Sequence, residues 1–559
     1  MTGRMPRRIV FFPGPVLLLG VCLITMLQAQ TPPETAPKFT ARSELVTVPV
    51  IVADKSGAHI HNLKKEDFVV TEDGKAQPIA VFEEVTQPPE LVHHAPPPPE
   101  HFSNALAIAS PAPPRLTIIV LDILNTPFTD QAYARSELVK FLADSVQSRE
   151  PTALLTIGRS GMKVIHDFTT NPAVLTAALQ KVKGTPQSLY QASQEELPSA
   201  AEVGAEMAQL LAFMRHTEQM QESFERRVTI MTTLQAMQQI AQAYAGVPGR
   251  KALIWASAGF PFSINPLSMT LKEVDALHES RSDVVPLYEK AWRALNQAQI
   301  AVYPVDVRGL VNPSYVGPTV HRAGPNYFDY QRWLQAETIS SFQTFAQATG
   351  GLASYNGNDL RRAFQKAADD NASYYLLGYY LNGHDEKVGW HKLDVKVHHD
   401  GAHVRARAGF FLSAPARDAQ DGARADVSLA LSSPLDYTGI QITGQWERVQ
   451  PAKDAGKKKV VFFLSMPAHI FQVDQDDHNH VVVDFAAVAR TDTGADGGDM
   501  SQTLDAHLRP ESLDQVENHG LDYRGSLTVA PGEYTVRFVV RDRLSGRMGS
   551  VEAPLNVGP

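Results

Sequence analysis

The polar residues best placed for chemistry follow an apolar run, TIIVLDILNTPF, at residues 117–128. The run begins as a buried strand and ends in a loop that carries a carboxylate (Asp122), an amide (Asn125) and a hydroxyl (Thr126). Open α/β sheets bind their ligands where strands pass into loops at the carboxyl edge. This loop is therefore a candidate metal site, the remnant of one, or only a strand end at which Asp122 caps the next helix.

Other motifs give no sign of catalysis. GRSG at 158–161 lacks the spacing of a nucleophile elbow, no H-E-x-x-H occurs, and GVPGRKA at 246–252 departs from a phosphate-binding loop. The acidic stretches DQDDHNH (474–480) and RTDTGADGGDM (490–500) could offer oxygen ligands to a cation, but solvated loops explain them better. We therefore expect a protein that is not an enzyme.

The charge balance argues against two classes of partner. The 559 residues include 51 Lys and Arg against 60 Asp and Glu, a net charge of −9. A negative chain has no long-range attraction to nucleic acid or to anionic lipid. At roughly 150 residues per domain, the length suggests three or four domains.

The amino terminus has the features of a secretory signal peptide over residues 1–29. A basic start precedes an apolar run centred on 16–27, and LQA stands before Gln30. An uncleaved anchor and a lipoprotein processed at Cys22 are the alternatives. We expect cleavage, no membrane span afterwards, and a periplasmic, outer-envelope or secreted location. Because Cys22 is the only cysteine, the mature chain would have no disulfide and no thiolate zinc site.

Composition divides the rest of the chain into five parts. The expected parts are an N-terminal β unit (30–87), a proline-rich linker (88–114), an α/β domain (115–372), a β meander (373–412) and a C-terminal β-sandwich (413–559). The predicted fold class is thus α/β, with a central doubly wound, mainly parallel sheet flanked by β-rich units and followed by a C-terminal antiparallel β-sandwich. We expect strands of this sheet at 116–122, 153–158, 162–166, 251–257, 299–306 and 351–355.

The two small β segments on either side of the α/β domain each approach the minimum for independent stability. Both have a strong apolar face, so residues 43–86 and 374–411 are expected to pack into one β domain. Two separate hairpin units, each packed on the α/β domain, are the alternative.

A methionine-rich stripe lies in the helical segment 193–224. Its members, at helical spacing, are Met207, Leu210, Leu211 and Met214. The stripe fits either an adaptable binding face or packing against a neighbouring helix, and we favour packing.

The order of these motifs resembles a known family. RLTIIVLD, GTP (184–186), GRKALIWASAGFPF and IAVYPVDVRGL together resemble a von Willebrand factor A domain. With GAHIHNLKKEDFVVTEDGKAQPIAVFEEV before them and SYYLLGYY and VRARAGFF after them, residues 43–412 resemble the VWFA-related family described from Acidobacteria. The C-terminal sandwich lies outside the resemblance.

The resemblance implies a metal site with a D-x-S-x-S motif, a threonine and a second aspartate. Asp122 matches the first aspartate, Thr126 the second serine and Thr185 the threonine, whereas Leu124 replaces the first serine. The expected TDG reads SAG from Ser257, so the second carboxylate is missing. The implied site is degenerate: it is vestigial or holds Mg²⁺ weakly, and no cofactor is required.

We therefore expect an exported, non-enzymatic protein-interaction protein of the adhesion or scaffold type. Its protein ligand would bind a rim of loops formed by Asp122, Asn125, Thr126, Thr185, Ser257, Phe260 and Phe262. The apolar loop GFPFSINP (259–266) could be a contact surface or be covered by residues 258–283. A structural spacer or assembly module of an envelope complex is the alternative, and an unrecognised hydrolase comes third.

Overall fold

The structure is a computed structural model of the chain. It describes residues 45–86, 92–93, 98, 100–106, 108–109, 115–144, 150–184, 205–265, 269–271, 281–310, 327–381, 389–412, 420–474 and 477–558. The expected signal peptide, most of the proline-rich linker and Thr185 lie outside the described residues.

A five-stranded mixed sheet carries the strands expected for the α/β region. In spatial order these are β10 (Gly161–Thr169), β9 (Thr152–Gly158), β8 (Leu116–Asp122), β11 (Lys251–Ser257) and β14 (Ile300–Asp306). Every residue of the last three strands is buried, which explains their nearly unbroken apolar runs. The β9–β8, β8–β11 and β11–β14 pairs are parallel, and β10 pairs with β9 antiparallel.

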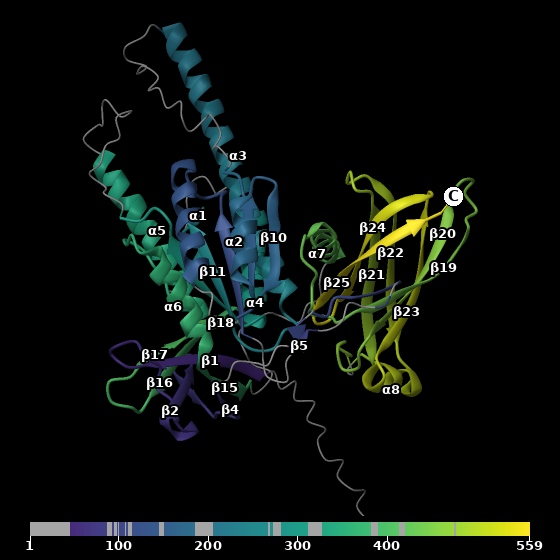
Figure 1. Cartoon of the computed structure of the whole chain (residues 1–559), viewed down its shortest axis with the longest axis horizontal. Coiled ribbons are helices and arrows are strands. Elements are labelled where there is room, and N and C mark those ends of the chain that lie inside the picture. The colour runs from purple at the N-terminus through teal and green to yellow at the C-terminus, as the bar shows by residue number, and fades with distance from the viewer. Residues whose placement is uncertain are drawn as a thin grey trace, which may run out of the picture. The chain divides into compact units, whose positions relative to one another are not determined.

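Helices cover both faces of this sheet (Figure 1). Ile119 and Leu121 pack with side chains of α1 (Phe128–Asp144), α2 (Pro172–Gln180) and α6 (Leu360–Ala372). Their neighbours on β8 point to the other face, towards α3 (Ala205–Ala243), α4 (Arg281–Gln297) and α5 (Tyr327–Thr349). Successive residues of β8 thus pack into two separate cores, one on each face of the sheet.

The segments before and after the α/β region share two small sheets. One has the order β17 (His403–Ala406), β1 (Leu45–Ala53), β15 (Tyr374–Tyr380) and β4 (Val81–Val85); the other has β18 (Gly409–Leu412), β16 (Gly389–Val397), β2 (Phe68–Glu72) and β3 (Lys75–Gln77). Valines of β1 and β2 lie in one core with Tyr375, Leu377 and Leu393. Each segment alone would leave this apolar face in water, so the strands that precede the α/β region complete the sheets that follow it.

The C-terminal region packs two four-stranded sheets around one apolar core. The first has the order β23 (Leu521–Val529), β20 (Lys458–Met466), β19 (Thr443–Pro451) and β6 (His101–Ser103). The second has β22 (Asp496–His507), β21 (His480–Arg490), β24 (Gly532–Asp542) and β25 (Met548–Val557), and the region also contains α7 (Gln420–Ser432) and α8 (Pro510–Asn518). Strand β6 lies within the segment expected to be a linker. It belongs to the sandwich because Phe102 is buried there and stacks on Phe538, with ring centroids 5.1 Å apart.

The predicted fold class is wrong. Of the sheets formed by the described residues, only the five-stranded one contains parallel pairs, and that sheet is mixed; all the others are antiparallel. Chain connections explain the difference, because parallel neighbours need a crossover of about a dozen residues or more. Two-residue links such as Asp73-Gly74 between β2 and β3 can join only antiparallel strands. The strand expected at 351–355 is a single bridge between Ser354 and Val305.

Within the described part of the chain, no helix combines the length and the apolar character that a bilayer crossing requires.

Candidate functional site

Asp122 lies at the centre of a buried cluster of hydrogen bonds. One carboxylate oxygen, Oδ1, accepts from the backbone N–H of Asn125 at 3.0 Å. The other, Oδ2, lies within 2.9–3.0 Å of three donors: Asn125 Nδ2, Trp255 Nε1 and Ser257 Oγ. Both oxygens of this side chain, which is fully buried, therefore have protein partners.

Parallel pairing of β8 with β11 explains why these residues meet. Leu121 lies opposite Ala256, so the carboxyl ends of both strands reach the same edge of the sheet. Asn125 then connects the cluster to α3, because its side-chain amide also donates to Thr233 Oγ1 at 3.0 Å. The carboxylate thus links two strands and, through Asn125, a helix.

The environment of Asp122 acts on its pKa in two directions. Burial raises the pKa, because the carboxylate loses its water. Hydrogen bonds from Asn125, Trp255 and Ser257 favour the charged form and oppose that rise. Burial is the larger effect, so the pKa of Asp122 lies above its usual value of 3.8.

Thr126 is hydrogen-bonded to the loop that follows β11. Its hydroxyl oxygen accepts from the backbone N–H of Ala258 at 3.2 Å, and its carbonyl accepts from Gln131 Nε2 at 2.9 Å. Thr126 is fully buried. Its hydrogen bonds therefore join the two loops of the predicted metal site to each other.

A magnesium ion would have to displace several of these partners. Mg²⁺ needs six oxygens at about 2.0–2.1 Å, whereas Asp122 already faces the side-chain amide of Asn125 and the indole N–H of Trp255. Asp306 could supply a second carboxylate, but both of its oxygens accept from the Arg308 guanidinium at 2.8–2.9 Å. Asp283 is another carboxylate of the sequence that could turn towards this site, and its side chain lies outside the described residues. Among described residues, this arrangement fits a structural link better than a cation site.

We expect Mg²⁺ at millimolar concentration to leave the melting temperature unchanged, because binding would orphan the buried indole N–H. Differential scanning calorimetry with and without the ion measures this. A ligand at 100 times its dissociation constant adds about 2.7 kcal/mol, a rise of a few degrees. Such a rise, lost in Asp122→Ala, would contradict the prediction.

The two aromatic rim residues pack against each other and against α5. Phe262 is 2% exposed, and Phe260 contacts it at 5.7 Å between ring centroids. Phe260 also lies 4.7 Å from Phe345 of α5, and Ser257 is fully buried. Phe262 and Ser257 are therefore not available to a protein ligand in this conformation, whereas Phe260 stays partly exposed.

A second polar cluster joins residues that no sequence motif connected. His391 Nδ1 lies 2.9 Å from Glu72 Oε1 and 3.1 Å from Asp73 Oδ2. The Tyr379 hydroxyl donates to the other oxygen of Glu72 at 2.9 Å, and the Lys392 N–H to the other oxygen of Asp73. The three facing atoms could hold a divalent cation. More than 300 residues separate His391 from its partners, so sequence spacing carries no signal for this cluster.

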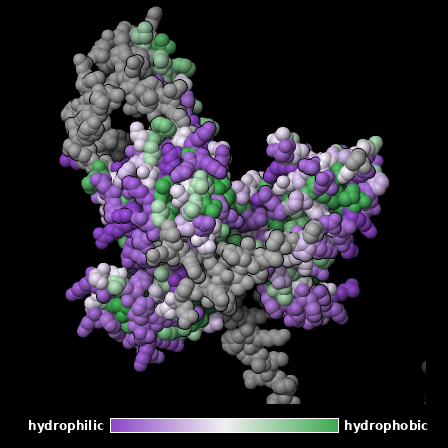
Figure 2. Space-filling view, viewed as in Figure 1, coloured by the Kyte–Doolittle hydropathy of each residue, from purple (hydrophilic) through white to green (hydrophobic). Residues whose placement is uncertain are grey.

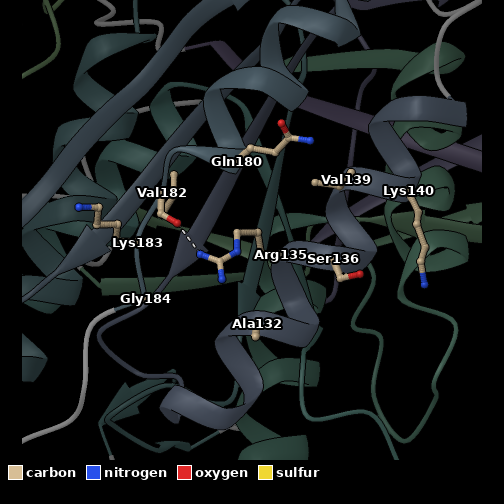
Figure 3. Close-up of a pocket in the computed structure, with 9 residues that line it drawn as sticks. All are labelled: Ala132, Arg135, Ser136, Val139, Lys140, Gln180, Val182, Lys183 and Gly184. Atoms are coloured by element: carbon tan, nitrogen blue, oxygen red, sulfur yellow. Dashed lines mark hydrogen bonds between the residues drawn. The ribbon is translucent and has the colours of Figure 1, made fainter.

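A shallow depression lies between α1 and α2 (Figure 3). The Arg135 guanidinium donates a hydrogen bond to the carbonyl of Val182 there. Lys140 lies 2.6 Å from Glu137, and Figure 3 shows it pointing away from Lys183. The depression is open and its cations do not converge, so it offers neither a nucleophile with a base nor an anion cradle.

The clearest exposed feature is the first part of α3. Met207, Leu210 and Met214 are 50%, 51% and 40% exposed, so the expectation that this stripe packs on a neighbouring helix is wrong for these residues. Four further large apolar side chains of the helix are exposed: Phe213, Met220, Phe224 and Val228. The seven together are called the α3 face below, and part of it is visible as hydrophobic surface at the projecting end of the helix (Figure 2).

The same helix is anchored by its second part. Ile230, Leu234 and Met237 are buried in the core beneath the mixed sheet. The described side chains of the helix before residue 229 are half-exposed or exposed, and most helix stability in proteins comes from packing of an apolar face. An apolar stripe exposed on such a segment indicates a contact surface.

Comparisons with known proteins do not identify the chain. No family model matches it, and no curated protein matches it. Among solved structures it is similar to proximal thread matrix protein 1 from the mussel byssus, at 10% identity and a TM-score of 0.23, over 46% of this chain and 48% of that one. It is also similar to the pilus adhesin SpaC from Lactobacillus rhamnosus GG in its open conformation, at 8% identity and a TM-score of 0.26, over 90% of this chain and 58% of the adhesin.

The chain thus spans about half the length of both structures. At these TM-scores neither likeness supports a conclusion about fold or function. The resemblance to the VWFA-related family stays a prediction from the sequence.

Proposed function

We propose that this chain is a non-enzymatic protein-interaction protein of the adhesion or scaffold type, exported from the cytoplasm. The observation that carries the proposal is the α3 face, with seven large apolar side chains exposed on one helix. The proposed contact surface thus moves from Ser257 and Phe262, which are buried, to α3, the helix that Asn125 contacts through Thr233.

The chemistry of this surface favours a protein partner. Methionine side chains adapt to apolar protein surfaces, and methionine and phenylalanine are both enriched at the cores of protein interfaces. Described charges on this part of the helix are mixed, with Glu218 and Glu225 against Arg226 and Arg227. Nucleic acid and anionic membranes need a cationic face instead.

Retention of native envelope proteins on the immobilised full chain tests the proposal. The variant Met214→Glu/Phe224→Glu places two charges on the α3 face and should abolish saturable retention. The control Ala212→Glu/His216→Glu adds the same charge at two exposed positions outside the α3 face and should retain partners as the wild type does.

Equal retention by both variants would remove the support for an interaction role of this face. It would favour the second candidate, a spacer or assembly module held through other surfaces. Circular dichroism and thermal melting of both variants show whether the helix and the core are intact.

A further inference from the structure

We infer that the α3 face binds the same face of a second copy of this chain, with the two helices antiparallel. The inference rests on the proposed function and names the partner of that surface. It follows from the spacing of the apolar residues, the area they expose and the position of the helix within the chain.

The spacing is that of a coiled coil. Residues 207, 210, 214, 217, 221, 224 and 228 follow one another in alternating steps of three and four, the heptad spacing of core positions in paired helices. Five of these seven are apolar and exposed. Phe213 and Met220 lie beside the stripe at flanking positions and widen it.

The two polar positions are adjacent and central. The Thr217 hydroxyl donates to the carbonyl of Phe213 at 2.9 Å, so its polar group is already satisfied within the helix. Antiparallel pairing centred near residue 219 sets Thr217 against the partner's Gln221. The same register sets Met214 against the partner's Phe224 and Leu210 against the partner's Val228. Polar residues then meet polar ones and apolar residues meet apolar ones.

The exposed area matches what a dimer needs. The seven side chains are between 40% and 69% exposed. With about 200 Å² for each residue, they offer roughly 700 Å² per copy, close to the ~800 Å² per partner of a standard interface. Pairing would also give the first part of α3 the packing that it lacks within one chain.

The anchoring of α3 selects the antiparallel orientation. Helices in a coiled coil lie about 8–10 Å apart. Parallel pairing would bring the two buried helix ends, each embedded in the core of its own sheet, to the same end of the pair. Antiparallel pairing places the two cores at opposite ends of the paired segment and avoids the collision.

Sedimentation equilibrium of the full chain tests the inference. The wild type and Ala212→Glu/His216→Glu should form dimers. Met214→Glu/Phe224→Glu should raise the dissociation constant at least about 100-fold, because each interface would bury four carboxylates against apolar partners. A wild type that stays monomeric at 100 μM, or a face variant that dimerises like the control, would overturn the inference.

Cysteine cross-linking tests the orientation in a Cys22→Ser background, since Cys22 is the only natural cysteine. An oxidised mixture of Thr217→Cys and Gln221→Cys chains should give cross-linked heterodimers, because facing positions come within the ~4.4–6.8 Å between Cα atoms that a disulfide spans. Efficient linking of Thr217→Cys to itself would indicate parallel pairing and contradict the antiparallel arrangement.

The outcomes separate this inference from the proposed function. A monomeric wild type that still retains envelope proteins through the α3 face would refute the second copy as partner and leave the interaction role in place. If Met214→Glu/Phe224→Glu loses both dimerisation and retention while the control variant keeps both, the results would support the dimer and the interaction role together. Vesicles of anionic lipid serve as a third probe, and binding to them through the same face would refute the protein partner altogether.

Discussion

Replacing Lys251 by methionine is expected to stabilise the protein by about 3 kcal/mol at pH 7. Lys251 is 1% exposed, and its ammonium donates to the carbonyl of Val247. Burial lowers the pKa of Lys251 from 10.5 to about 7. At 1.36 kcal/mol per pKa unit, holding this group in the core costs about 4–5 kcal/mol when the unfolded chain is charged. Methionine removes that cost and loses one hydrogen bond, worth about 1 kcal/mol.

The pH dependence gives this prediction a distinct signature. Between pH 7 and 10.5 the unfolded chain binds the Lys251 proton more tightly than the folded chain does, so the stability of the wild type rises with pH in this window. The methionine variant should lack that part of the rise. Urea denaturation at pH 7 and pH 10 measures it, with Lys163→Met on the exposed side of β10 as the control. A variant less stable than the wild type at pH 7 would show that the core does not penalise the charge.

Removing the Asp122 carboxylate should destabilise the protein by about 3–5 kcal/mol. The Asp122→Ala change removes the acceptor of the buried Trp255 indole N–H and of the Asn125 backbone N–H. Each orphaned buried donor costs about 1–3 kcal/mol, and the cavity adds to this. Asp122→Asn keeps the volume but directs an amide towards those donors, so a smaller loss of about 1–3 kcal/mol is expected.

Chemical denaturation of both variants measures these losses. Asp144→Ala is the control, because that carboxylate is at the exposed end of α1 and makes only a surface ion pair with Arg361 at 2.7 Å. Since burial raises the pKa of Asp122, the wild type should lose part of the Asp122 contribution as pH rises from 3.8 through that raised value. A loss below 1 kcal/mol for Asp122→Ala would mean that water replaces the carboxylate at little cost.

Several strands of the mixed sheet could be located from the sequence alone. The run LTIIVLD was expected at 116–122 and forms β8 over those residues, and KALIWAS forms β11 over the expected 251–257. Seven consecutive residues that are nearly all apolar can be buried on both faces only in the interior of a covered sheet. A local signal of this strength needs no knowledge of the neighbouring strands.

Which strands are neighbours depended on the tertiary structure. The predicted class took a mainly parallel sheet as the centre of the fold, whereas every described sheet but one is antiparallel and that one is mixed. Strand β6 illustrates the reason. Its three residues lie in a proline-rich stretch and pair with β19, more than 300 positions later. Phe102 of this strand packs in the sandwich core. A pattern within a window of ten residues cannot contain that partner.

The sequence by itself determined which residues carry polar groups and which stretches are apolar: Asp122 at a strand end, Lys251 at a strand start, and a methionine-rich stripe on a helix. Only the tertiary structure decided what those residues face. Asp122 meets Trp255 from 133 positions away, Glu72 meets His391 from 319 positions away, and Met207, Leu210 and Met214 of the stripe are exposed. Periodicity shows which side of an element is apolar, but burial is set by whether another element packs on that side, and this depends on the whole chain.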